Sequence, residues 1–135
     1  MATLLAKIQT KPGTEAEFED VMQYMYRQTH ATEKDVLRYE YWRGREPGFY
    51  YCLLSFPDSL AFWRHQASDH HEGEMERFAR CIAELDLEIV DPVKTAAPLP
   101  PTQVMDCPET ESDFVREQAG QYPIELANWW LGLRG

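Results

Sequence analysis

Residues 36–56 read VLRYEYWRGREPGFYYCLLSF, and this stretch decides which fold the rest of the chain must complete. The runs 36–43 and 49–56 are rich in aromatic and branched side chains, which favour strands. Between the runs, Pro47 and Gly48 follow the order of the two central residues of a type II turn. The stretch therefore predicts a β-hairpin.

Two more strands flank the hairpin in the sequence. Residues 3–10 alternate with the period-two spacing of a strand, and residues 87–93 close the series as a fourth strand. Residues 15–31 carry apolar side chains at helical spacing instead. Thr14 and Glu17 have the spacing of a capping box, so we expect the first helix to begin there.

A second helical region follows the hairpin. It opens near Ser59, breaks at residues 68–70, and resumes with an apolar face that we expect to continue as far as Leu85. Ser68 or Asp69 is expected to cap the resumed helix, because both side chains accept hydrogen bonds from free helix amides.

The element order is then β-α-β-β-α-β, which predicts an α+β fold: a ferredoxin-like four-stranded antiparallel sheet over residues 1–93. Two helices can cover only one face of this sheet, yet large apolar side chains occupy both faces. These are Tyr39, Tyr41, Trp42, Tyr50, Tyr51, Leu53 and Leu54. We therefore expect a homodimer in which the two uncovered sheet faces meet.

The composition changes after residue 93. Five of the nine prolines lie in residues 92–110, which predicts an extended arm, and residues 111–134 predict two short helical pieces. We expect residues 94–135 to form a proline-rich arm and a docked helical extension, because exposing the adjacent Trp129 and Trp130 to water is unfavourable. The partner subunit is the expected docking site, where the extension would reinforce the dimer or close a pocket.

Charge and composition exclude several classes of protein. The net charge is −10 and the basic residues are scattered, so neither nucleic acid nor an anionic membrane surface is an expected partner. No apolar run approaches the ~20 residues of a spanning helix, and we expect a cytoplasmic protein. Cys52, Cys81 and Cys107 are far apart and odd in number, which predicts free thiols.

Four pieces of the sequence together resemble one known family. They are KPGTEAEFEDV (11–21), LRYEYWR (37–43), FPDSLAFWRHQASDHHEGEM (56–75) and DPV (91–93). In this combination the chain resembles the antibiotic biosynthesis monooxygenase (ABM) superfamily of dimeric α+β barrels over residues 2–93. The resemblance implies the fold more strongly than the chemistry, because the superfamily includes cofactor-free quinol oxygenases and haem-degrading enzymes.

The residues that the resemblance would assign to chemistry are altered in this chain. An asparagine, a tryptophan and a tyrosine of the cofactor-free oxygenases correspond to Cys52, Phe56 and Phe62 here. The haem-binding histidine of the haem-degrading branch corresponds to Met75, and the first-strand asparagine of that branch falls near Ala6. The resemblance therefore implies no haem, and no cofactor is expected.

The histidines are the remaining candidates for chemistry. No metal is expected at His65, His70 and His71, because a two-histidine helical site uses spacing i and i+4. His71 continues the apolar stripe of its helix and is expected to face the sheet, whereas His70 is expected on the charged outer face. His71 is thus either a candidate acid/base or a buried histidine bonded to a backbone carbonyl.

Two hypotheses for function remain. The first is a cofactor-independent monooxygenase acting on an aromatic, quinol or polyketide-like molecule, with His71 as acid/base. The second is a non-catalytic or stress-related dimer that binds a small aromatic ligand. In both, the expected ligand-binding residues are Tyr39, Cys52, Phe56, Phe62, Trp63 and His65, each of which is otherwise explained as core.

Overall fold

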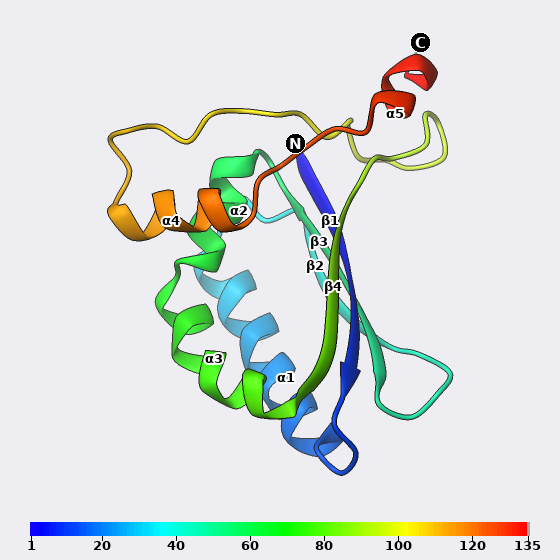
Figure 1. Cartoon of the computed structure of the whole chain (residues 1–135), viewed down its shortest axis with the longest axis vertical. Helices are drawn as coiled ribbons and strands as arrows, with labels where there is room; N and C mark the ends of the chain where they lie inside the picture. Colours follow the sequence, from blue (N-terminus) through cyan, green and yellow to red (C-terminus); the bar gives the residue numbers. More distant parts are fainter. Residues whose placement is uncertain (135) are drawn as a thin grey trace.

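A computed structural model describes residues 1–134 and contains one four-stranded sheet, with α1 and α3 on the same side of it (Figure 1). The strand order is β2-β3-β1-β4, and every neighbouring pair is antiparallel. The ferredoxin-like prediction is confirmed. The elements are β1 (Ala2–Thr10), α1 (Glu15–Thr32), β2 (Arg38–Arg43), β3 (Phe49–Phe56), α2 (Ser59–Gln66), α3 (Asp69–Cys81), β4 (Ile82–Val90), α4 (Asp113–Gln121) and α5 (Asn128–Leu133).

The predicted hairpin joins β2 to β3. The amide of Phe49 donates to the carbonyl of Glu46 at 3.2 Å, which closes a four-residue turn around Pro47 and Gly48. Gly48 has φ +82°, a left-handed value that the second central residue of a type II turn requires and that glycine adopts without steric cost. The turn at Pro47 and Gly48 predicted from the sequence is confirmed.

The end of the second helical region differs from its prediction. Helix α3 ends at Cys81, and Ile82 already begins β4, so the helix does not extend to Leu85. Residues 84–89 alternate strictly between acidic and aliphatic side chains, and this period-two pattern prevails over the helical one. Leu85 and Leu87 consequently face the helices, while the acidic side chains at 84, 86 and 88 face solvent.

The start of α1 also differs in detail. Thr14 precedes the helix, but its side chain does not cap it. The Thr14 hydroxyl instead donates toward the carbonyls of Lys11, at 2.7 Å, and Cys81, at 3.2 Å. The predicted capping box is therefore wrong, and Thr14 links the start of α1 to the end of α3.

One face of the sheet is covered and the other is open. Helices α1 and α3 bury the inner face, whose core includes Leu4, Ile8 and Phe18. On the outer face, Trp42 is 60% exposed and Tyr51 is 42% exposed. Apolar aromatic surface is therefore available on the side of the sheet that none of the helices within residues 1–134 covers.

The extension lies against the domain at Thr102 in the arm, and again through α4 and the segment after it. Val115 and Ile124 are buried, and the indole N–H of Trp63 donates to the carbonyl of Tyr122 at 2.9 Å. Helix α5 lies at the opposite end of the extension, away from α1 and α3 (Figure 1). Trp129 is 69% exposed there, so burial of both indoles is not found within this chain.

Candidate functional site

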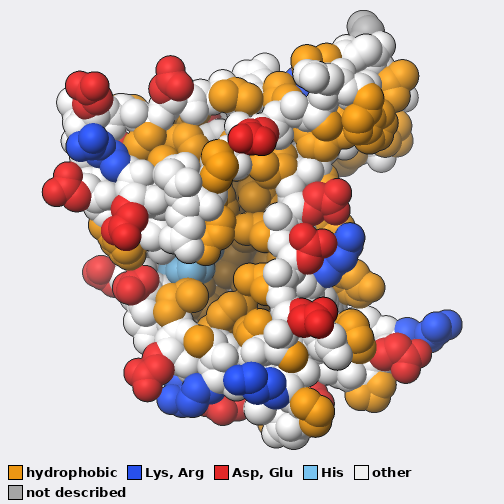
Figure 2. All heavy atoms as spheres, viewed as in Figure 1, with side chains coloured by type: hydrophobic (Ala, Val, Ile, Leu, Met, Phe, Trp, Pro, Cys, Tyr) orange, Lys and Arg blue, Asp and Glu red, His pale blue; other side chains and the backbone are white. Residues whose placement is uncertain are grey.

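A cavity of about 90 Å³ lies between the inner face of the sheet and helices α1 and α3. Its apolar walls include Ile8, Met25 and Phe78, and its polar lining includes His65 and His71. In the space-filling view, a hollow lined with apolar side chains opens at the surface, and a histidine lies at its border (Figure 2). The geometry combines an apolar recess with a few polar atoms, as small-molecule sites do.

His65 comes from the last turn of α2. Asp58 caps this helix by accepting from the amide of Ala61 at 2.8 Å, which fixes where the helix begins. The ring is 1% exposed and packs between Tyr39 and Phe56, at centroid distances of 4.9 and 5.3 Å. This packing holds the imidazole in one orientation.

The two nitrogens of His65 differ in their surroundings. Nδ1 lies 2.8 Å from Oε1 of Glu33, so Nδ1 carries the proton and donates it to the carboxylate. Nε2 is buried and has no hydrogen-bond partner among residues 1–134. A carboxylate–imidazole pair thus leaves an unshared lone pair on Nε2, on a residue that lines the cavity.

His71 comes from the first turn of α3. Ser68 caps this helix by accepting from the amide of His71 at 3.3 Å, and the imidazole lines the cavity, as its place in the apolar stripe predicts. Burial lowers the pKa of His71 to about 3, helped by the neighbouring rings of His65 and His70, while a hydrogen bond to the backbone of Gln66 opposes the change. The imidazole is therefore neutral near pH 7, and its Nδ1 is a second buried nitrogen without a partner in the described chain.

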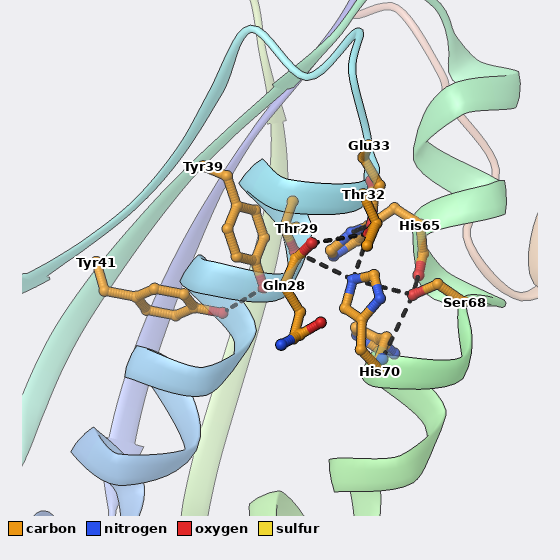
Figure 3. A network of polar contacts seen from close by, with 10 residues as sticks. Gln28, Thr29, Thr32, Glu33, Tyr39, Tyr41, His65, Ser68 and His70 are labelled. Carbon is orange, nitrogen blue, oxygen red and sulfur yellow. Dashed lines mark hydrogen bonds and ion pairs between the residues drawn. The ribbon is translucent and has the colours of Figure 1, made fainter.

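His70 does not lie on the outer face of α3. Its side chain is 10% exposed, and its Nε2 lies 2.9 Å from Oε1 of Glu33 (Figure 3). The break at Ala67 and Ser68 separates two helices with different axes, so spacing within one continuous helix does not apply to His65 and His70. Both imidazoles reach the same carboxylate, although their spacing argued against a shared site.

The predicted ligand-binding residues divide into two groups. Tyr39 and Cys52 line the cavity together with His65, and burial raises the pKa of the Cys52 thiol to about 12, so the thiol stays protonated. Phe56, Phe62 and Trp63 do not line it. They lie in the core, where Phe56 packs on Phe62 at a centroid distance of 5.7 Å.

Two residues of the site had no signal in the sequence. Glu33 lies just after α1 in a run of charged residues, which is typical of a solvated turn. Tyr122 belongs to the extension and reaches the wall of the cavity, where its ring also meets Phe62 at 6.1 Å. The extension therefore helps to close the cavity through Tyr122 rather than through its tryptophans.

A run of polar contacts connects the site to the sheet. The hydroxyls of Tyr39 and Tyr41 are 2.9 Å apart, and Thr29 lies 3.2 Å from Nε2 of His70 (Figure 3). Burial raises the pKa of Tyr39 and of Tyr41 well above the usual range, so both phenols remain neutral hydrogen-bonding groups.

Comparisons with known proteins agree with this architecture. A solved structure of a Caulobacter crescentus CB15 protein named for the ABM family is 24% identical, with TM-score 0.65, over 69% of this chain and 90% of that chain. A conserved protein of Methanosarcina mazei Go1 is 22% identical, with TM-score 0.61, over 66% of this chain and 89% of that one. A Nitrosomonas europaea protein, also named for the family, is 14% identical, with TM-score 0.64, over 69% and 99%.

These identities show a shared fold, and the family itself is shown by sequence. No curated protein matches the chain. The family model for antibiotic biosynthesis monooxygenase matches residues 1–77, which is more than half of the 135 residues. The chain belongs to the antibiotic biosynthesis monooxygenase family.

Proposed function

We propose that this protein is a cofactor-independent monooxygenase of single-ring phenols or hydroquinones, with His65 as the general base. The observation that carries the proposal is the pair of buried, unpartnered nitrogens, His65 Nε2 and His71 Nδ1, on two residues that line one cavity. A buried polar atom without a partner is costly, so a ligand that supplies hydroxyl donors there gains binding energy.

The size of the cavity restricts the ligand class. An engineered cavity of about 150 Å³ holds benzene, whereas drug-sized ligands need roughly 300 Å³ or more. The cavity described here has about 90 Å³ and opens to the surface. Because this volume is smaller than that of the benzene cavity, a single ring fits only by extending into the open mouth or by shifting the lining side chains, and a polyketide-sized molecule would need the helices to move.

The proposed roles follow from the hydrogen bonds. Glu33 holds the proton on Nδ1 of His65, so Nε2 can take the proton of a ligand hydroxyl. His71 Nδ1 would accept a hydrogen bond and orient the ring, because this imidazole is too weak a base to be the proton acceptor. Tyr39 and Cys52 complete the wall as neutral groups.

The reaction balances without an added reductant. Deprotonation of a hydroquinone gives an electron-rich anion, which donates electrons to O2 and forms a carbon–oxygen bond at the ring. Loss of water from the ring peroxide leaves a hydroxyquinone. Hydroquinone plus O2 thus yields hydroxyquinone plus water, with one oxygen atom of O2 in each product.

The test is O2 uptake with a panel of single-ring hydroquinones, with the products identified by mass. We expect His65→Gln to lower kcat by about 10²–10⁴-fold, the usual range for loss of a general base. His30→Gln is the matched control, because His30 bonds to the backbone of Tyr39 outside the cavity. Wild-type turnover in a folded His65→Gln variant would refute the assignment.

A second function is favoured by one observation. The positions that the resemblance assigns to polar groups hold Cys52, Phe56 and Phe62, and the two phenylalanines are buried in the core. A domain with this core could bind a phenol without oxidising it. Saturable binding of hydroquinones with no O2 uptake, in wild-type protein, would favour this ligand-binding function over the oxygenase.

We also propose that the protein is a homodimer through the uncovered face of the sheet. Trp42 and Tyr51 are exposed on that face, where they are cross-strand neighbours in β2 and β3. Sedimentation at micromolar concentration should give twice the mass of the 15.8 kDa chain, and Trp42→Glu should shift it toward monomer. A wild-type monomer would refute this assembly.

Membrane insertion finds no support in the helices. Among the described residues, none of the helices is both long enough and apolar enough to cross a membrane.

A further inference from the structure

We propose that Glu33, His65 and His70 form a binding site for a divalent first-row transition metal ion. One oxygen, Glu33 Oε1, lies 2.8 Å from His65 Nδ1 and 2.9 Å from His70 Nε2. The three candidate ligand atoms all lie within 4.8 Å of one another. A small displacement of each side chain would place all three at bonding distance from a single ion.

The donor set selects the class of ion. Two imidazoles and one carboxylate are typical of zinc sites that keep a fourth position for water, and of non-haem iron sites. Magnesium and calcium prefer sites made of oxygen ligands, so the two imidazoles disfavour them. Zn²⁺ is therefore the appropriate probe.

The surroundings of His70 supply a second, independent observation. Three oxygens face its Nε2: Glu33 Oε1 at 2.9 Å, Thr29 Oγ1 at 3.2 Å and Ser68 Oγ at 3.3 Å. As for His65, the carboxylate fixes the one proton of this nitrogen toward Glu33, so the nitrogen cannot also donate to the two hydroxyls. When a cation replaces that proton, the hydroxyl oxygens of Thr29 and Ser68 lie where they can bond to the water that completes its coordination.

The three ligands are held in place by different elements. Glu33 directly follows α1, His65 lies in the last turn of α2, and His70 lies in the first turn of α3 (Figure 3). His65 is fixed by the rings of Tyr39 and Phe56, so the site is largely formed before any ion binds. A bound ion would join the three helices at the point where α2 and α3 meet.

The site would also change the cavity, a consequence that rests on the proposed function. Without metal, the proton of His65 is on Nδ1 and Nε2 is an acceptor. A metal on Nδ1 displaces that proton to Nε2, which becomes a donor toward the cavity. Metal binding would thus remove the general base and stop hydroquinone oxidation, while a ligand with an acceptor group would bind better.

The experiment is calorimetric titration of the chelator-treated full chain with Zn²⁺ alone, without any phenol. We expect one equivalent to bind, and His70→Ala and Glu33→Gln each to weaken binding by at least about 10–100-fold. His30→Ala is the matched control, because it removes one histidine outside the cluster and should leave the affinity unchanged. Circular dichroism of each variant establishes that it is folded.

Two results would overturn the proposal. One is the absence of Zn²⁺ binding by the folded wild-type chain, and the other is affinity that His70→Ala and Glu33→Gln both leave unchanged. Because binding is measured without substrate, failure here leaves the oxygenase proposal standing. Conversely, failure of metal-free protein to oxidise hydroquinones leaves the metal site standing.

Discussion

Replacing Thr102 by valine should destabilise the whole domain, although Thr102 lies in the proline-rich arm. The side chain is fully buried. Its hydroxyl donates to the carbonyl of Val90 at 2.8 Å and accepts from the amide of Thr3 at 3.4 Å. Thr102 therefore attaches the arm to β4 and β1 at once. Valine has the same shape and fills the same space, so the substitution removes only the two hydrogen bonds.

The magnitude follows from those two bonds. A buried backbone group left without a partner costs about 1–3 kcal/mol, and the long bond to Thr3 contributes at the lower end. The sum is about 2–4 kcal/mol. Unfolding entropy of about 2.1 cal/mol/K per residue converts 1 kcal/mol into about 3.5 °C for a chain of 135 residues. The melting temperature should therefore fall by about 7–14 °C.

The assay is urea denaturation followed by far-ultraviolet circular dichroism, together with a thermal scan. Thr110→Val is the matched control, because Thr110 is exposed, and it should change stability by less than about 0.5 kcal/mol. A Thr102→Val variant as stable as the wild type would mean that the arm is not anchored at β4, and the reasoning about the extension would fail with it.

Two further outcomes are expected. Alanine should have opposite effects on stability at two glycines. Gly48→Ala should destabilise the fold by about 1–2 kcal/mol, because φ is +82° and the new methyl group would meet Thr10 Oγ1 at 3.1 Å. Gly73→Ala should stabilise it by up to about 1 kcal/mol, because Gly73 lies in α3 with open space around it. Equal effects in denaturation would contradict this. The Arg134 guanidinium holds the pKa of the Asp91 carboxyl below its usual range. The ion pair therefore stabilises the folded state fully above the ordinary aspartate pKa, and this stabilisation is lost as pH falls through the lowered pKa. Tryptophan fluorescence should therefore report release of α5 in acid, and Asp91→Asn should release it at neutral pH; a pH profile unchanged by Asp91→Asn would refute the role of this ion pair.

The sequence predicted the sheet well because each strand has its own local signal. Alternation marks residues 3–10, and Pro47 with Gly48 marks the turn of the hairpin. The boundary between α3 and β4 was missed because apolar residues at 75, 78, 82 and 85 also fit a helix. The helical and the strand periodicity overlap in these residues, and the segment from Ile82 is a strand because it pairs with β1.

The candidate site was only partly predictable. The inward direction of His71 follows from one helix face, which a sequence pattern can show. The meeting of Glu33, His65 and His70 depends on the angle between α2 and α3 and on where α1 ends. Those are tertiary features, and no spacing in the chain encodes them. The same holds for Tyr122, which is separated by 59 residues from its hydrogen-bond partner Trp63.

Because Tyr122 lines the cavity, the ligands of a relative without this residue do not predict the ligands of this protein. The family match ends at residue 77, while part of the cavity wall is supplied by a residue far beyond it. A relative that lacks this appended segment must have a different wall, even where its sheet and helices superpose on those described here. Ligand selectivity can thus diverge through the tail alone, and a version of this protein that ended after β4 would report the preferences of a more open and less discriminating recess.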